Sequence, residues 1–272
     1  MTSYYEIAHN NMDLLTIKST NLESTALSHT TVHSVWGYFT IEANYPENVP
    51  SIPLDIVLII DVSSSMKIDN KYITMLNMIK YLLTKLNERH TITLITFNNE
   101  FLVLTHLLEC SDDNKTKILS ILNKIKDTEL LETTNIYAGL FAGIKIILNR
   151  PYQIKPSSLL LFTDGNHSIG FTNNYLVDEL RKTKLPTDCI INTFGIGPTN
   201  NSELLFTIAH LGKGCYHHID NTQNNEQIVK IFAEYITSLL NILICNIKIV
   251  FKCHDGCRLI TLVTPFEMEM KI

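Results

Sequence analysis

The stretch PLDIVLIIDVSSSM, residues 53–66, decides the expected fold. An apolar run, residues 56–60, ends at a single carboxylate, Asp61. Hydroxyl side chains then follow at alternate positions, Ser63 and Ser65. A run that is apolar at every position predicts a strand buried on both faces, as in a parallel sheet covered by helices. Because a helix cap needs only one such oxygen, a carboxylate and two hydroxyls in alternation indicate a binding site.

Composition and charge exclude several classes of protein. The chain has 272 residues, of which 45% are hydrophobic and 18% charged, so it has room for one large domain with a sizeable core and a small companion. The net charge of −5 gives no electrostatic case for a nucleic-acid or anionic-membrane partner. No apolar run is long enough for a membrane span, and the N-terminus lacks the features of a secretory signal. We therefore expect a cytoplasmic or otherwise intracellular protein.

Apolar runs and segments of helical spacing alternate through residues 51–243, which predicts one α/β domain with a doubly wound, mostly parallel, Rossmann-like sheet. The connection at 98–100 is too short for a crossover, so 101–107 should run antiparallel to 91–97 at an edge of the sheet. The expected strands are 54–60, 91–97, 101–107, 158–163, 189–196 and 214–219, and the expected helices are 69–88, one after Ser111, 135–148, 174–183, 202–211 and 222–243.

Two of these helices carry specific expectations. Asp69 stands where a capping residue would begin the first helix. The helix 135–148 is apolar nearly all round, and Gly139 and Gly143 lie one turn apart on it, which favours close packing. It is therefore predicted to be buried.

The two ends of the chain break the α/β rhythm. Residues 1–50 and 244–272 are expected to meet in a small antiparallel β module, whose C-terminal part is expected to be incomplete. Its strands should be 12–18, 31–43, 246–253 and 257–263.

The cysteines do not form a disulfide framework. Cys110, Cys189 and Cys215 are expected to be small buried residues. Within CHDGC, a two-residue hairpin loop would place Cys253 and Cys257 on opposite faces, whereas a three-residue loop would place them across from each other. The sequence does not decide between these loops, and no disulfide is assigned.

Oxygen side chains also occur at other boundaries of the predicted sheet. Asp164 follows the strand 158–163, and Thr134 directly precedes the helix 135–148. In an open α/β sheet ligands bind at the carboxyl ends of the strands, where Asp61 and the serines also lie. Carboxylates and hydroxyls are hard donors that suit Mg²⁺, Mn²⁺ or Ca²⁺.

These motifs resemble the von Willebrand factor type A (vWA) domain family over roughly residues 50–243. The resemblance rests on D-x-S-x-S at 61–65, the threonine of ETTNIYAGL, the aspartate of LFTDG and the TFGIG run at 193–197. The first three are similar to the family's metal-ion-dependent adhesion site. The family usually has glycines where this chain has Glu132 and Thr133, and the Asn-Ile that follows favours Thr134 over Thr133 as the metal ligand.

The resemblance implies a role for each residue of that site. Ser63, Ser65 and Thr134 would contact the metal through their hydroxyls, while Asp61 and Asp164 would act largely through water. Neutral ligands leave the cation under-neutralised, so it would take a carboxylate from an Asp or Glu of a protein partner.

The implied function is a protein–protein interaction that depends on a divalent cation, and not catalysis. Four residues are expected to form the partner-binding rim: Met66, Lys67, Asn135 and His167. We also expect the carboxylate of Asp61 to face solvent and metal rather than the core.

Two alternatives remain open. A Mg²⁺-dependent phosphatase-like enzyme would use Asp61 as its nucleophile, but such enzymes resemble D-x-D, whereas position 63 is serine here. They also need a lysine near the phosphate, and the sequence places no lysine clearly in that role, although Lys67 is nearby. A scaffold domain with a non-functional metal site is the other alternative. His217 and His218 are expected to point to opposite faces of a strand and so not to share an ion.

Overall fold

A computed structural model describes residues 15–21, 37–43, 52–126, 134–151, 155–165, 172–222 and 225–241. The chain divides into a larger unit, Pro50–Cys245, and a smaller unit that comprises Met1–Val49 and Asn246–Ile272.

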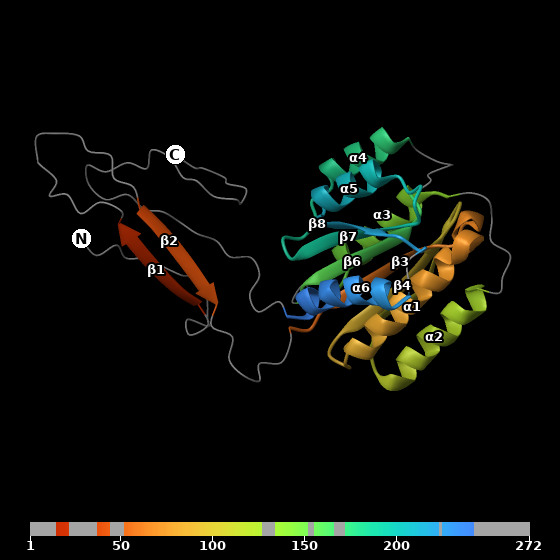
Figure 1. Cartoon of the computed structure of the whole chain (residues 1–272), viewed down its shortest axis with the longest axis horizontal. Helices are drawn as coiled ribbons and strands as arrows, with labels where there is room; N and C mark the ends of the chain where they lie inside the picture. The colour runs from red at the N-terminus through yellow and green to blue at the C-terminus, as the bar shows by residue number, and fades with distance from the viewer. Residues whose placement is uncertain are drawn as a thin grey trace, which may run out of the picture. The chain divides into compact units, whose positions relative to one another are not determined.

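The larger unit is built on a six-stranded sheet with the order β5-β4-β3-β6-β7-β8 (Figure 1). The edge strand β5 is antiparallel to β4, and the other neighbouring strands are parallel. The predicted fold is therefore confirmed, with its antiparallel edge strand. The strands are β3 (Asp55–Asp61), β4 (Thr91–Phe97), β5 (Phe101–Glu109), β6 (Ser157–Thr163), β7 (Cys189–Ile196) and β8 (Lys213–Ile219).

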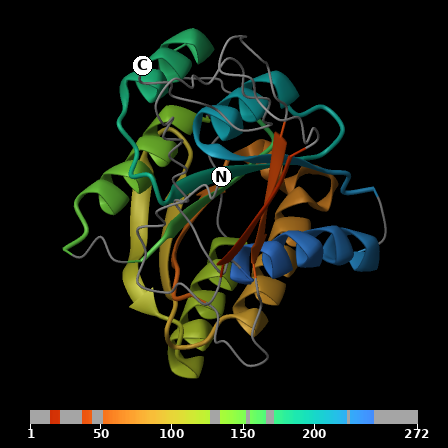
Figure 2. The same ribbon diagram turned by 90° about the vertical axis from the view of Figure 1, so that its left-hand side faces the viewer.

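Helices cover both faces of this sheet. One core lies between the sheet and α1, α2 and α6, and a second lies between the sheet and α3, α4 and α5. Helices α1 and α6 lie side by side in both views (Figures 1 and 2). The helical segments are η2 (Ser64–Asn70), α1 (Lys71–Lys85), α2 (Asp112–Lys126), α3 (Ile136–Leu148), α4 (Asn173–Lys182), α5 (Ser202–Leu211) and α6 (Asn225–Leu240).

Strand β3 lies in the middle of the sheet and contributes to both cores. Ile56, Leu58 and Ile60 pack on the α1 side. Val57 and Ile59 pack on the α3 side. Because successive side chains of a strand alternate between faces, a strand covered on both sides must be apolar at every position. This is the physical reason for the uninterrupted apolar run that ends at the site.

The two glycines of α3 allow this helix to lie close to the sheet. A Cβ atom on Gly139 would lie 2.6 Å from the ring of Phe97, and one on Gly143 would lie 2.8 Å from Ile59. The predicted close packing of this helix is confirmed.

The start of α1 differs from the prediction. Asp69 does not cap the helix, because it adopts a left-handed conformation with φ 54° inside the preceding 3-10 segment. The N-cap is Asn70, which is also left-handed with φ 59° and makes no side-chain capping bond. Two consecutive left-handed residues therefore redirect the chain before α1 begins at Lys71. The helix ends at Lys85, short of the predicted residue 88.

In the smaller unit, β1 (Leu15–Asn21) pairs antiparallel with β2 (Gly37–Ala43), with Leu15 opposite Ala43. The expected strands 246–253 and 257–263, and the loop between Cys253 and Cys257, lie outside the described residues. That they complete the module stays a prediction.

The isolated cysteines were predicted correctly in part. Cys110 and Cys189 are buried free thiols. Cys215 is exposed, because it lies on the edge strand β8, so that prediction was wrong.

Candidate metal centre

The candidate site lies at the carboxyl ends of the central strands. β3 and β6 are parallel neighbours with Ile60 opposite Phe162, so Asp61 and Asp164 follow at the same edge of the sheet. Both aspartates have no exposed surface, and Ser63 between them in the chain is equally buried. Three polar side chains are thus enclosed where the strands end.

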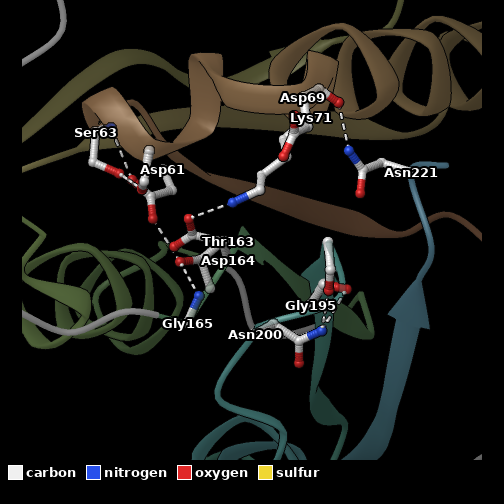
Figure 3. A network of polar contacts seen from close by, with 12 residues as sticks. Asp61, Ser63, Asp69, Lys71, Thr163, Asp164, Gly165, Gly195, Asn200 and Asn221 are labelled. Atoms are coloured by element: carbon white, nitrogen blue, oxygen red, sulfur yellow. Dashed lines mark hydrogen bonds and ion pairs between the residues drawn. The ribbon is translucent and has the colours of Figure 1, made fainter.

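The carboxylate of Asp61 is held by two hydrogen bonds. The backbone N–H of Ser63 donates to its Oδ1 at 2.9 Å, and the hydroxyl of Thr163 donates to its Oδ2 at 2.5 Å (Figure 3). The Thr163 hydroxyl in turn accepts a bond from the N–H of Gly165 at 2.9 Å. The expectation that Asp61 faces solvent was wrong, because the loop folds back over the strand end and encloses the carboxylate.

The pKa of Asp61 is raised to about 6, chiefly by burial and to a smaller extent by the negative charge of Asp164, against the lowering effect of the bonds from Thr163 and Ser63. Enclosure disfavours the charged form of a carboxyl group, and so does a second carboxylate nearby. A cation bound between the two carboxylates would relieve both effects.

The serine hydroxyls lie together. The Oγ atoms of Ser63 and Ser65 are 3.0 Å apart, with Ser63 buried and Ser65 half-buried. Ser63 is the N-cap of η2, but its side chain makes no capping hydrogen bond. Helix capping therefore does not account for the second oxygen of the motif.

The start of α3 is fixed against the neighbouring strand end. The N–H of Asn135 donates to the carbonyl of Asn98 at 2.6 Å, and its side-chain amide donates to the carbonyl of Asn99 at 3.2 Å. These carbonyls belong to the turn after β4, and the N–H of Val62 bonds the carbonyl of the last residue of β4. Thr134, which is 2% exposed, is thereby placed at the same edge of the sheet as Asp61.

Lys71 is a member of the site that the sequence did not indicate. Its ammonium lies 3.0 Å from Oδ2 of Asp164, and the two side chains are 7% and 1% exposed (Figure 3). The expectation that no lysine has a clear claim to this site was therefore wrong. Because Lys71 and Asp164 are 93 residues apart in the sequence, no local motif predicts their contact.

The four predicted rim residues have different positions. Lys67 is exposed, and His167 lies outside the described residues. Asn135 is half-buried, and its side chain accepts a bond from the N–H of Ala138. Met66 was predicted wrongly, because it has no exposed surface and packs in the core on the α1 side.

The histidines of β8 point to opposite faces, as predicted. His217 stacks on Phe194 with ring centroids 4.9 Å apart, whereas His218 bonds the side chain of Asn200 at 2.8 Å. Side chains on opposite faces of a strand cannot easily hold the same ion.

The donors present fit a hard divalent cation. They are the carboxylates of Asp61 and Asp164 and the hydroxyls of Ser63 and Ser65, with Thr134 at the same edge. Oxygen ligands of this kind suit Mg²⁺, Mn²⁺ and Ca²⁺. In the part of the chain that the structure describes, no three His, Cys, Asp or Glu side chains gather as a metal site, so hydroxyl groups would have to supply part of the coordination.

Comparison with known proteins agrees with this architecture. The family model of the von Willebrand factor type A domain matches residues 55–234. The chain belongs to this family.

Its similarity to individual proteins is low. It is 25% identical over 176 residues to the uncharacterized protein YfbK of Escherichia coli (strain K12), covering 64% of this chain and 30% of that protein. It is 25% identical over 217 residues to inter-alpha-trypsin inhibitor heavy chain H3 of Mus musculus, covering 77% of this chain and 24% of that protein. The chain thus spans less than a third of the length of these relatives.

Solved structures share the fold. A von Willebrand factor type A protein from Catenulispora acidiphila has a TM-score of 0.60 at 15% identity, covering 87% of this chain and 51% of that chain. Proximal thread matrix protein 1 from the mussel byssus, with a zinc-occupied MIDAS motif, has a TM-score of 0.53 at 19% identity, covering 68% and 46%. Within the described residues, no helix is long and apolar enough to cross a membrane.

Proposed function

We propose that this vWA domain binds a protein partner through a divalent cation at the carboxyl edge of its sheet. Asp61, Ser63, Ser65, Thr134 and Asp164 would hold the ion, and an Asp or Glu carboxylate of the partner would complete its coordination. Domains of this family commonly mediate protein–protein interactions. The proposal is therefore a cation-dependent form of a general family role.

The observation that carries the proposal is the polar cluster at the end of β3. Ser63 and Ser65 bring their hydroxyls to 3.0 Å from each other, beside the enclosed carboxylate of Asp61. Burying polar groups costs free energy unless something compensates them, and a cation beside them is one such compensation. When bound, the ion would act as a Lewis acid that attracts an anionic oxygen.

The site's charge favours binding over catalysis. Hydroxyl ligands are neutral, so they leave positive charge on the ion that a partner carboxylate can neutralise. Ion and partner should each tighten the other's binding, by linkage. Mg²⁺ gives up its waters reluctantly, so the affinity of the domain alone for Mg²⁺ should be modest, and Mn²⁺ or Ca²⁺ should compete.

The test uses Mn²⁺ as a paramagnetic probe. Mn²⁺ bound to the full chain enhances the relaxation of water protons, and a carboxylate that replaces a bound water lowers this enhancement. A short peptide with one central Glu should lower it, whereas the same peptide with Gln should not. Ser63→Ala should weaken Mn²⁺ binding, with Ser120→Ala on α2 as the matched control.

Two results would contradict the proposal. One is wild-type protein without saturable Mn²⁺ binding. The other is an equal effect of the Glu and Gln peptides, because the ion would then have no preference for a carboxylate. Zn²⁺ should be included as a competing ion, since a relative in fold carries zinc in its MIDAS motif.

A phosphatase-like activity is a second candidate, and Lys71 favours it, since such enzymes need a lysine near the phosphate and Lys71 lies beside Asp164. The position of Asp61 speaks against it. A nucleophile must reach the phosphorus atom, but this carboxylate is fully buried and both of its oxygens accept hydrogen bonds. Hydrolysis of a generic phosphate ester that requires Mg²⁺ and is lost in Asp61→Asn would establish the enzyme and contradict the binding proposal.

A further inference from the structure

The candidate metal centre contains a cation that belongs to the protein itself. The ammonium of Lys71 bonds Oδ2 of Asp164 at 3.0 Å, and both side chains are almost completely enclosed. Asp164 is one of the two carboxylates that would attract a divalent ion. Lys71 therefore already neutralises part of the negative charge on which ion binding depends.

The backbone holds Lys71 in this position. Asp69 and Asn70 are both left-handed, a conformation that costs energy for residues other than glycine and is best tolerated by Asn and Asp. The side chain of Asn221, in the loop after β8, donates a hydrogen bond to the carbonyl of Asp69 (Figure 3). This contact joins the bend before α1 to the loop that follows the edge strand β8, and it helps to fix the direction in which α1 starts.

Space for the lysine side chain is also provided. Gly197 follows β7 with φ +97°, and a Cβ atom there would lie 2.8 Å from Cε of Lys71. A glycine at this position keeps the backbone close to the lysine stem without a clash. The bend, the Asn221 contact and Gly197 come from different segments of the chain, and each accommodates the same side chain.

We propose that Lys71 is an internal counter-cation that lowers the site's affinity for divalent ions and stabilises the domain when no ion is bound. This inference rests on the proposed function. With Lys71 present, Asp61 and Asp164 together with the ammonium carry a net charge of one negative unit, instead of two. An incoming dication is repelled by the ammonium or must displace it, and either effect raises the dissociation constant.

The proposal predicts opposite effects of removing Lys71. Lys71→Met keeps most of the apolar stem and removes the charge, so Mg²⁺ and Mn²⁺ should bind about tenfold more tightly or better, since enclosed charges interact strongly. Without an ion, the same variant leaves the buried carboxylate of Asp164 without its ammonium counter-charge, so its melting temperature should fall by about 6 °C or more. Added Mg²⁺ should then raise the melting temperature of the variant more than that of wild type.

The measurements are titration calorimetry with Mg²⁺ and Mn²⁺ and thermal unfolding of the full chain with EDTA or Mg²⁺. Lys80→Met is the matched control, because Lys80 lies on the same helix and is exposed, so it should leave ion affinity and stability unchanged. Asn221→Ala is a second variant that keeps every charge but removes the contact with Asp69. It should tighten ion binding by about two- to threefold, because the ammonium is then held less firmly.

The outcomes separate the inference from the proposed function. Tighter ion binding by Lys71→Met than by wild type supports the inference. This includes the case in which wild type shows no binding over the ion concentrations tested. Equal or weaker binding by Lys71→Met, with measurable binding by wild type, overturns the inference alone. No binding by either protein overturns both. Folding of Lys71→Met only in the presence of Mg²⁺ also supports the inference. The inference fails if Lys71→Met stays unfolded with Mg²⁺ and Asn221→Ala binds ions with the same affinity as wild type.

Discussion

Thr163 is the residue whose removal should reveal how the site is stabilised. It is fully buried at the end of β6, donates to Asp61 at 2.5 Å and accepts from the N–H of Gly165 at 2.9 Å. Thr163→Val has nearly the same shape, so it creates no cavity, but it removes both hydrogen bonds. Loss of a bond to a charged group costs about 1.5–3 kcal/mol, and an unpaired buried N–H costs about 1–3 kcal/mol. We expect Thr163→Val to lower the free energy of unfolding by about 3–4 kcal/mol.

Urea unfolding of the full chain, followed by circular dichroism in EDTA, measures this loss. Thr163→Ser is the matched control, because it keeps the hydroxyl and loses only a methyl group, which should cost less than about 1.5 kcal/mol. Two results would refute the reasoning. One is a free energy of unfolding of Thr163→Val that differs from that of wild type by less than about 1 kcal/mol. The other is a Thr163→Ser variant as unstable as Thr163→Val, because packing rather than hydrogen bonding would then explain the loss.

Three further changes test the fold of the larger unit. Gly143→Ala should cost about 1–3 kcal/mol in urea unfolding, because its Cβ would lie 2.8 Å from Ile59, and an unchanged midpoint would contradict the close packing of α3. Arg150→Met should cost about 3–5 kcal/mol, because Arg150 bonds Asp55 at 2.9 Å and the buried carboxylate would lose its ion-pair partner, keeping the hydrogen bond from Thr91; a melting temperature like that of wild type would contradict this. Burial, together with nearby positive charges, lowers the pKa of His90 from 6.5 to about 4. Between these two pH values the unfolded chain binds a proton at His90 that the folded chain does not. The stability that neutral His90 contributes is therefore fully present above about pH 6.5 and is lost as the pH falls toward 4. Between pH 7 and 5, wild type should lose about 2 kcal/mol more than His90→Gln, and equal losses would show that His90 does not titrate in this way.

The strands and their directions could be predicted because their causes are local. A strand covered on both faces must be apolar along its covered length, and residues 56–60 of β3 are. A connection as short as 98–100 cannot cross over a sheet, so β5 had to be antiparallel. The carboxyl ends of parallel strands share one edge, so the order of strands and helices along the chain was enough to predict that Asp61 and Asp164 lie at that edge together.

The rest of the site depends on contacts between distant segments. Lys71 reaches Asp164 only because two left-handed residues redirect the chain, and the sequence instead favoured Asp69 as a simple cap. Met66 follows the serine motif and was predicted at the rim, but the 3-10 segment turns its side chain into the core. Thr163 looked like an ordinary strand residue, since only the fold shows that its hydroxyl faces Asp61.

The most direct test of the central claim is a crystal of the full chain soaked in Mn²⁺, with the anomalous signal of manganese used to locate the ion. The account predicts a peak within about 2.1–2.4 Å of the hydroxyl oxygens of Ser63 and Ser65, at the carboxyl end of β3. An Asp61→Asn crystal treated in the same way should show a much weaker peak. A wild-type crystal saturated with Mn²⁺ that shows no peak at these serines, with Lys71 still bonded to Asp164, would contradict the account.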